Sequence, residues 1–284
     1  MLKLKELPDF FKLICPQLIG RDMEFLKKIV ALQLFSNPSV GEKVHILCCG
    51  DVASGKTILA SWLEDVVPNS RYVTKRVTEV GMCDSLIASN SGILVVDELD
   101  KIPKQIREQM LEAMQTGKVT TTKHKYYSKQ DAKVNVLAFC NPISYILQDT
   151  NILNMLPFKL PLLSRFHLFA KIPAPPKETY RDIAFQQETW SEEKDKELQL
   201  KIRDYLITAK REIPIVELSS RAIDEIGRFV EYLKEVSPLK DLVSPRTIEG
   251  IRSCVKARAR MMNRNNVTRE DLNYVFSIFE ECLR

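Results

Sequence analysis

The sequence predicts an α/β protein, in which a parallel sheet flanked by helices is followed by a small all-α lid domain. Three observations indicate this organisation. Short apolar runs alternate with helix-spaced apolar residues as far as Ile172. A segment with Pro173, Pro175 and Pro176 then marks a linker, and every periodic segment after it has helical spacing. The expected domains are residues 1–173 and residues 174–284.

The predicted elements of the first domain begin with a helical lead-in over residues 10–35, which breaks near Cys15 and Pro16. Five short apolar or β-branched runs then indicate strands, with helices between several of them. The expected strands are residues 45–49, 71–73, 93–96, 134–140 and 167–171. Apolar runs of this length are typical of parallel strands that are buried on both faces.

Two helix starts in the second domain carry capping residues. Ser244 precedes Pro245, which suits an N-cap followed by a first-turn proline. Thr268 and Asp271 have the spacing of a capping box. The helix-spaced apolar residues of this domain are expected to form its core rather than a ligand site; they include Tyr205, Leu206, Ala209, Ile251, Val255 and Ala259.

The composition limits the classes of function. A chain of 284 residues with 45% hydrophobic content can bury a large core, and a formal charge of +5 is only mildly basic. No run approaches the ~20 apolar residues that a membrane span needs, and charged residues near Met1 argue against a signal peptide. The seven cysteines form no C-x-x-C pair, which predicts neither disulfides nor a zinc site. We therefore expect a soluble protein with no membrane partner.

The strongest functional pattern follows the first predicted strand. Residues 50–57 read G-x-x-x-x-G-K-T between an apolar run and helix-spaced apolar residues. Such a turn directs backbone N–H groups and the positive end of a helix at one place, where a polyphosphate can bind. Lys56 would reach the β- and γ-phosphates, and Thr57 would ligate Mg²⁺. The predicted nucleotide-binding loop is Gly50, Asp51, Val52, Ala53, Ser54, Gly55, Lys56 and Thr57. The alternative is a glycine turn that matches by chance.

Two acids end the strand expected at residues 93–96. Asp97 and Glu98 would lie at the carboxyl edge of the sheet, next to the phosphate-binding loop. Asp97 can hold Mg²⁺ through water, while Glu98 can polarise the attacking water. The alternative is that the two acids are ordinary solvated residues at a strand end. The predicted phosphate-binding loop beside them favours the catalytic interpretation.

The order of motifs resembles the AAA+ ATPases of the minichromosome maintenance (MCM) helicase family. After the loop come Val-Val-Asp-Glu at residues 95–98, Cys140-Asn141-Pro142, Leu-Leu-Ser-Arg-Phe at residues 162–166, and Ser244-Pro245-Arg246. The resemblance runs from about Pro16 to the end of the chain. It implies an AAA+ ATPase core that uses ATP and Mg²⁺.

The resemblance also implies roles for single residues. Leu18 and Ile19 match the segment that packs near the adenine, and Asn141 matches the sensor 1 residue that positions the hydrolytic water. Arg165 matches the arginine finger and Arg246 the sensor 2 arginine, although both could instead make local contacts. In this family the two arginines act on the nucleotide of a neighbouring subunit. We therefore expect self-association, or assembly with another MCM subunit, into a ring that is hexameric in the family.

A basic segment precedes the sensor 1 strand. It contains Lys118, Lys123, Lys125, Lys129 and Lys133 with a single acid, Asp131, and strands are expected at residues 119–122 and 126–130. In the MCM family this position holds a β-hairpin that grips the DNA backbone, so Lys123, His124 and Lys125 are the predicted DNA-binding residues. Phosphate contacts of this kind give affinity without sequence readout. The alternative is a charged edge hairpin that resists aggregation.

The sequence departs from the family in four places. Val52 and Ala53 replace proline and glycine in the loop, which could lower nucleotide affinity. The hairpin tip reads Lys-His-Lys, without the usual glycine. Only residues 79–83 are expected to bridge the region where the family has a second hairpin. The chain also begins close to the ATPase module, so we expect a motor core without the family's amino-terminal domain.

Three functions fit these patterns. The first and favoured one is an ATPase that couples ATP hydrolysis to DNA translocation or unwinding. The second is a regulatory ATP-binding subunit of a larger MCM ring. The third is a protein-remodelling ATPase of the related MoxR or chelatase type. The expected location is the cytoplasm, associated with the nucleoid, or the nucleus of a eukaryote.

Overall fold

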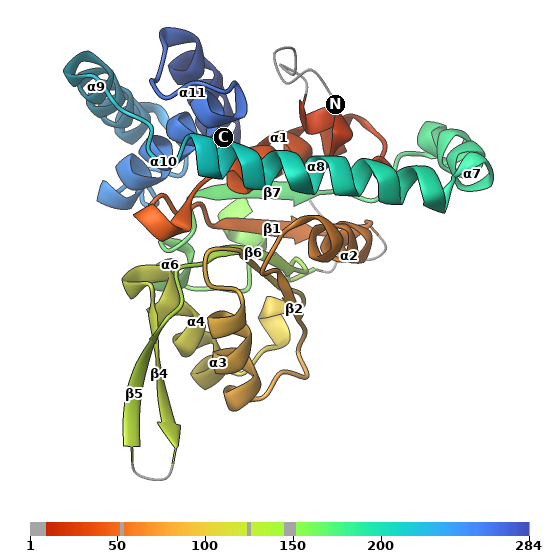
Figure 1. The fold of residues 1–284 in the computed structure, drawn as a ribbon, viewed down its shortest axis with the longest axis horizontal. Helices are drawn as coiled ribbons and strands as arrows, with labels where there is room; N and C mark the ends of the chain where they lie inside the picture. Colours follow the sequence, from red (N-terminus) through yellow and green to blue (C-terminus); the bar gives the residue numbers. More distant parts are fainter. Residues whose placement is uncertain (1–9, 52–53, 124–125, 145–151, 284) are drawn as a thin grey trace.

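The chain folds around a parallel sheet, as the computed structural model shows for residues 10–51, 54–123, 126–144 and 152–283 (Figure 1). The sheet has five strands in the order β2-β3-β6-β1-β7. All neighbouring strands pair in parallel. The strands are β1 Ile46–Gly50, β2 Arg71–Val73, β3 Ile93–Val96, β6 Asn135–Cys140 and β7 Leu168–Ile172. The predicted α/β fold class is confirmed.

Burial explains why these strands could be recognised in the sequence. Every residue of β1, β3 and β6 is buried. A parallel strand covered on both faces needs a continuous apolar run rather than alternation. Each of the five expected strands is present, with ends that differ by at most one residue. For example, β1 begins at Ile46 instead of His45 and includes Gly50.

The helices of the first part connect these strands. They are η1 Phe10–Leu13, α1 Arg21–Phe35, η2 Pro38–Val40, α2 Lys56–Val66, α3 Glu79–Ala88, η3 Leu99–Lys101, α4 Lys104–Thr116, α5 Ile152–Met155 and α6 Leu160–Leu163. The predicted lead-in corresponds to η1 and α1. Between β2 and β3 the structure has the single helix α3, and residues 79–83 are its first part. The segment between these two strands, all of which is described, therefore contains no second hairpin.

The part after residue 173 is helical, as predicted. It contains η4 Lys177–Thr179, α7 Tyr180–Thr189, α8 Glu192–Glu212, α9 Ser220–Val236, α10 Pro245–Met261 and α11 Arg269–Cys282. Thr268 and Asp271 form the predicted capping box, in which the Asp271 carboxylate accepts the Thr268 N–H at 2.9 Å. Ser244 directly precedes α10. All six apolar residues expected in the core are buried: Tyr205, Leu206, Ala209, Ile251, Val255 and Ala259.

A buried ion pair joins the helical part to the first part. Arg260 of α10 is fully buried, and its guanidinium lies 2.8 Å from the Glu42 carboxylate. It also donates to the backbone oxygens of Phe35 and Ile213, each at 2.7 Å. Because the bonds to Glu42 and Phe35 cross residue 173, the two parts pack as neighbours. The domain boundary there stays a prediction.

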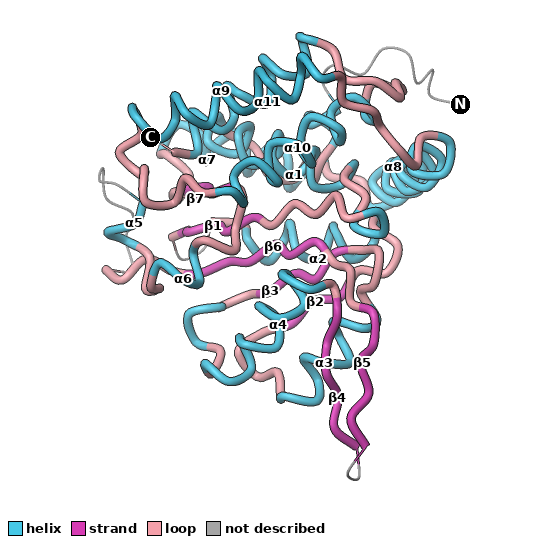
Figure 2. Tube along the Cα trace, turned by 90° about the vertical axis from the view of Figure 1, so that its left-hand side faces the viewer, coloured by secondary structure: helices cyan, strands magenta, loops and turns pink. Residues whose placement is uncertain are grey.

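A long hairpin leaves the body of the molecule beyond α3 and α4 (Figures 1 and 2). It consists of β4 Lys118–Lys123 and β5 Tyr126–Asp131, paired antiparallel from Lys118 opposite Asp131 to Lys123 opposite Tyr126. Both strands are longer than the sequence predicted. His124 and Lys125, like Val52 and Ala53 of the phosphate-binding loop, lie outside the described residues. Among the helices that are described, none has the length and apolarity required to cross a membrane.

Candidate active site

The loop between β1 and α2 needs glycine at both of its ends. Gly50 ends β1, and a Cβ atom there would lie 3.0 Å from the Ser54 hydroxyl and 3.1 Å from Ile172. Gly55 has a φ of 82°, a left-handed conformation that favours glycine. A Cβ atom on Gly55 would lie 2.5 Å from the Leu18 side chain. The helix α2 then begins at Lys56, so its positive end faces the loop.

Lys56 lies among groups from three parts of the carboxyl edge of the sheet. Its ammonium donates to the backbone oxygens of Gly50 at 2.9 Å and Asp51 at 2.5 Å, and to the Asn141 side chain at 3.5 Å. Burial lowers the pKa of Lys56, and the negative charge of Asp97 opposes this shift. The structure therefore brings the predicted Lys56, Asp97 and Asn141 together, from the ends of β1, β3 and β6.

The two acids after β3 have different environments. Asp97 accepts hydrogen bonds from the Tyr72 hydroxyl at 2.9 Å and from the backbone N–H of Glu98 at 2.8 Å. Glu98 has a φ of 51°, which is costly for a residue other than glycine and is often found at functional sites. Its carboxylate contacts the ammonium of Lys101 and, at 3.0 Å, that of Lys75. These lysines, Lys101 first, lower the pKa of Glu98 and keep it ionised.

An apolar cavity of about 530 Å³ lies beside the loop. Leu18 and Ile19 line it together with Ser54, Gly55 and Ile58, and α7 with its flanking residues contributes Tyr180, Ile183 and Trp190. Apolar walls with aromatic rings at the end of a phosphate-binding loop suit a flat heteroaromatic base. The segment predicted to contact the adenine is therefore placed next to the loop.

The donors at this edge fit magnesium bound together with a nucleotide. Thr57, at the start of α2, and Asp97 supply hard oxygen atoms. Within the described ranges, no group of three or more His, Cys, Asp or Glu side chains is placed to hold a metal ion. Magnesium is usually held by one or two carboxylates plus phosphate oxygens and water, so this sparse set is sufficient.

Arg165 and Arg246 lie at the amino ends of the strands, opposite the carboxyl ends that carry the phosphate-binding loop. Arg165 precedes β7, and Arg246 donates to the hydroxyl of the neighbouring Ser164 at 3.1 Å. The phosphate-binding loop follows the other end of β1, which runs parallel to β7 from Ile46–Leu168 to Gly50–Ile172. A strand of this length spans roughly 16 Å at ~3.3 Å per residue. An arginine side chain does not cover that distance, so neither arginine reaches its own loop.

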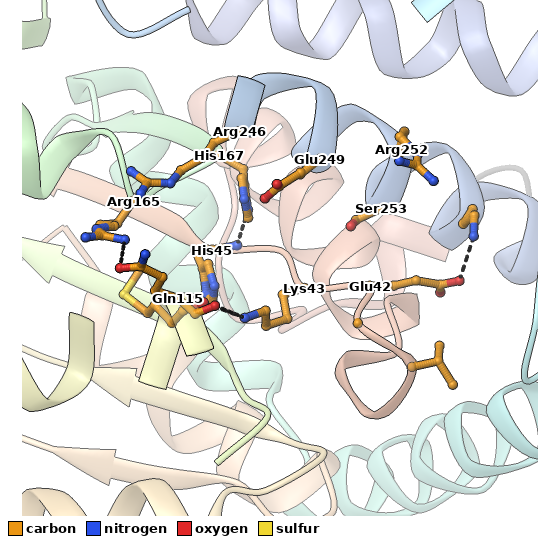
Figure 3. A pocket seen from close by; sticks show the side chains of 14 residues that line it. Glu42, Lys43, His45, Gln115, Arg165, His167, Arg246, Glu249, Arg252 and Ser253 are labelled. Carbon is orange, nitrogen blue, oxygen red and sulfur yellow. Dashed lines mark hydrogen bonds and ion pairs between the residues drawn. The ribbon is translucent and has the colours of Figure 1, made fainter. Parts of the chain in front are cut away.

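The two arginines line a polar cavity of about 420 Å³ (Figure 3). Its cations come from the segment before β1, from the segment before β7 and from α10, and they are Lys43, Arg165, Arg246, Arg252 and Lys256. The acids in its wall are Glu42 and Glu249. Burial, and to a lesser extent the charge of Arg246, lowers the pKa of Arg165. An excess of cations in a concave site attracts anions such as phosphate.

Two stacked histidines form the wall of this cavity next to the sheet. The ring centroids of His45 and His167 are 5.1 Å apart. Nδ1 of His45 accepts a hydrogen bond from the backbone N–H of Val136 at 3.2 Å. Nδ1 of His167 accepts one from the backbone N–H of His45 at 3.0 Å. Burial is the main cause that lowers the pKa of both rings from the ordinary value of 6.5. The folded protein therefore holds both histidines neutral.

We expect the free energy of unfolding to fall as the pH drops below about 6.5. Since the folded-state pKa values are depressed, the unfolded chain takes up protons that the folded chain does not. The loss would reach about 2 kcal/mol at pH 5 for His167, whose pKa is lowered by burial to about 3, and His45 would add to it in the same direction. Urea unfolding at pH 7 and pH 5 measures it, and His167→Gln should reduce the difference. Equal stabilities of the wild type at the two pH values would contradict this.

Several contacts of the candidate residues were missed by sequence reasoning. Lys101 follows Glu98 by three residues and could have been found by spacing. Tyr72 and Lys75 reach the acids from β2 and the segment after it, and Gln115 of α4 bonds Arg165. These contacts join segments far apart in the sequence, and no pattern indicates them. Lys123 lies at the end of β4, and its DNA-binding role stays a prediction.

The fold and the loop define a P-loop protein, a class that binds nucleotides, typically with Mg²⁺. The family model of the MCM P-loop domain matches residues 3–185, more than half of the chain. The chain therefore belongs to the MCM family.

Curated relatives agree with this assignment. "Minichromosome maintenance protein MCM" of Saccharolobus solfataricus is 27% identical over 89% of this chain and 41% of its own length. "DNA replication licensing factor mcm4-B" of Xenopus laevis is 26% identical over 99% of this chain and 37% of its own. "DNA replication licensing factor Mcm2" of Drosophila melanogaster is 26% identical over 94% of this chain and 35% of its own. The chain spans less than half the length of these relatives.

Proposed function

We propose that the chain is the ATP-hydrolysing motor core of an MCM-type DNA translocase or helicase, with each catalytic site formed between two subunits. The observation that carries this proposal is the placement of two half-sites. The phosphate-binding loop, Asp97, Glu98 and Asn141 lie at one edge of the sheet, and Arg165 and Arg246 lie at the other. A head-to-tail contact between copies would join the two halves, and repeated contacts of this kind close into rings. We infer a hexamer, in keeping with the family.

In the first half-site, the loop residues 50–57 would bind the phosphates through their backbone N–H groups. Lys56 would exchange its bonds to the loop oxygens for the β- and γ-phosphates, since an ammonium prefers an anion to a carbonyl. Bound Mg²⁺, held by Thr57 and Asp97, would neutralise charge that develops on the phosphates. Glu98 and Asn141 would orient the attacking water, while Leu18 and Ile19 contact the base.

In the second half-site, Arg165 and Arg246 would stabilise the charge on the γ-phosphate of the neighbouring subunit. Their cavity already carries an excess of cations. Burial lowers the pKa of Arg165, but a guanidinium stays charged at neutral pH. Association of subunits thereby becomes a condition for fast hydrolysis.

The hairpin is proposed to contact DNA through Lys123, His124 and Lys125. The backbone of β4 and β5 extends away from the body of the molecule, and Lys123 is the last residue of β4 (Figure 1). Two of the relatives described above are named DNA replication licensing factors. Lysines that contact phosphates would hold any sequence, as a translocating motor requires.

ATP turnover with and without single-stranded DNA tests this function. We expect DNA to raise kcat, Glu98→Gln to lower it by at least about 10²-fold, and Lys123→Ala to remove most of the stimulation by DNA. Lys240→Ala, which changes an exposed lysine outside the hairpin, is the matched control. Turnover that DNA leaves unchanged would contradict a DNA motor.

A second candidate is a regulatory subunit that binds ATP and hydrolyses it slowly within a larger MCM ring. The paired lysines on Glu98 favour it, because a carboxylate that bonds two ammonium groups is a weaker base. Tight ATP binding with negligible turnover in the assembled homo-oligomer would support this candidate. If a polypeptide replaces DNA as the stimulating ligand, with little dependence on salt, a protein-remodelling ATPase is favoured instead.

A further inference from the structure

Gln115 lies in the last turn of α4 and contacts Arg165. Its side-chain oxygen accepts a hydrogen bond from Nη1 of Arg165, which Figure 3 draws as a dashed line. Nε of Arg165 is buried and has no hydrogen-bond partner within the part of the chain that the structure describes. The bond that Arg165 donates to Gln115 therefore restricts the direction in which this guanidinium points.

The backbone around Gln115 is fixed to the floor of the arginine cavity. The ammonium of Lys43 donates to the backbone oxygens of Met114 at 2.5 Å and of Gln115 at 3.3 Å. These bonds satisfy two of the carbonyls that a helix end leaves without partners. Gly117, with a φ of 69°, then ends the helix in a left-handed turn. The position of Gln115 is thus set by α4 and by Lys43 together.

The base of the hairpin is attached to the same turn of α4. β4 begins at Lys118, directly after Gly117, and the backbone N–H of Ala132 donates to the Gly117 oxygen at 2.8 Å. The Thr120 hydroxyl donates to the Glu112 carboxylate of α4 at 3.1 Å. The first residues of β4 are therefore bonded directly to the part of α4 that holds Gln115.

We propose that Gln115 is a positioning residue for Arg165 and links the position of the hairpin to the reactivity of the neighbouring subunit's nucleotide. This inference rests on the proposed function. The hairpin and the arginine belong to one subunit. A force that displaces the hairpin would therefore change the direction of an arginine that acts on the nucleotide of the neighbouring subunit. A misplacement of only about 1 Å can cost up to 10²-fold in rate.

The experiment compares Gln115→Ala, Gln115→Glu and Gln105→Ala in the assembled protein. Gln105 is an exposed residue of the same helix, far from its last turn, and serves as the matched control. We expect Gln115→Ala to lower kcat with DNA about tenfold, to leave the KM for ATP within about twofold, and to reduce the ratio of turnover with DNA to turnover without it. Gln115→Glu keeps the acceptor oxygen and should restore most of the rate.

A double variant identifies the route of the effect. Since Gln115 acts through Arg165, Arg165→Ala with Gln115→Ala should be no slower than Arg165→Ala alone. A double variant that is slower than Arg165→Ala alone would overturn the inference. So would a Gln115→Ala protein with an unchanged kcat, or with an unchanged ratio of turnover with DNA to turnover without it. Failure of the proposed function is distinguishable, because Arg165→Ala would then keep the wild-type rate. A slow Arg165→Ala beside a normal Gln115→Ala rejects only the role of Gln115.

Discussion

Replacing Arg165 with alanine is expected to lower kcat for ATP by about 10³-fold or more, while ATP binding stays close to that of the wild type. The physical reason is that Arg165 lies at the edge of the sheet opposite its own phosphate-binding loop. Under the proposed function it would contribute charge to the transition state in a neighbouring subunit and little to the binding of ground-state ATP in its own. Steady-state turnover together with equilibrium binding of a labelled nucleotide separates these two effects.

Arg221→Ala is the matched control for this variant, because Arg221 is an exposed arginine of α9 that pairs with Glu225. It should keep the wild-type kcat. An Arg165→Ala protein that turns over at the wild-type rate would show that the arginine plays no part in hydrolysis. A loss of nucleotide binding that matches the loss of turnover would place its role in the subunit's own site instead.

Removing Arg260, a fully buried arginine of α10, should have the largest effect on stability. Arg260→Ala is expected to lower the free energy of unfolding by about 3–5 kcal/mol, because it leaves the buried Glu42 carboxylate with less compensation. It also leaves the backbone oxygens of Phe35 and Ile213 without this donor. Lys256, 3.4 Å from Glu42, compensates in part. Urea unfolding at pH 7 measures the change.

The matched control for this second prediction is Arg228→Ala. Arg228 pairs with Asp224 on the exposed side of α9, with 75% of its side chain accessible, so its loss should cost less than about 1 kcal/mol. Arg260→Met separates charge from packing, since it removes the donor and keeps much of the volume. Equal stabilities of Arg260→Ala and Arg228→Ala would contradict the role assigned to the buried ion pair.

Local patterns explain which parts of the fold could be predicted from the sequence. Every residue of β1, β3 and β6 is buried, and only continuous apolar runs such as Ile93–Val96 satisfy that environment. The capping box of Thr268 and Asp271 and the glycines of the phosphate-binding loop are also dictated by backbone needs within a few residues. The observed strands differ from the predicted ones only at their ends, because the last hydrogen bonds between strands depend on where the neighbouring strand ends.

The contacts that tune the site depend on tertiary structure and could not be predicted in the same way. Lys75 meets Glu98 because β2 and β3 are adjacent in the sheet. Gln115 meets Arg165 because α4 ends beside the segment that precedes β7. The resemblance to the MCM family suggested that the arginines act on another subunit. The strand directions support this proposal, since the arginines and the loop lie at opposite ends of parallel strands.

The most direct measurement mixes two inactive variants. Lys56→Ala removes the lysine of the phosphate-binding loop and keeps Arg165 and Arg246. Arg165→Ala keeps the loop intact and removes the predicted arginine finger. If each site is shared between neighbours, an equal mixture assembled with single-stranded DNA and ATP should contain about a quarter of intact interfaces and regain turnover. Turnover of the mixture that does not exceed the average of the two separate variants would contradict a site formed between subunits.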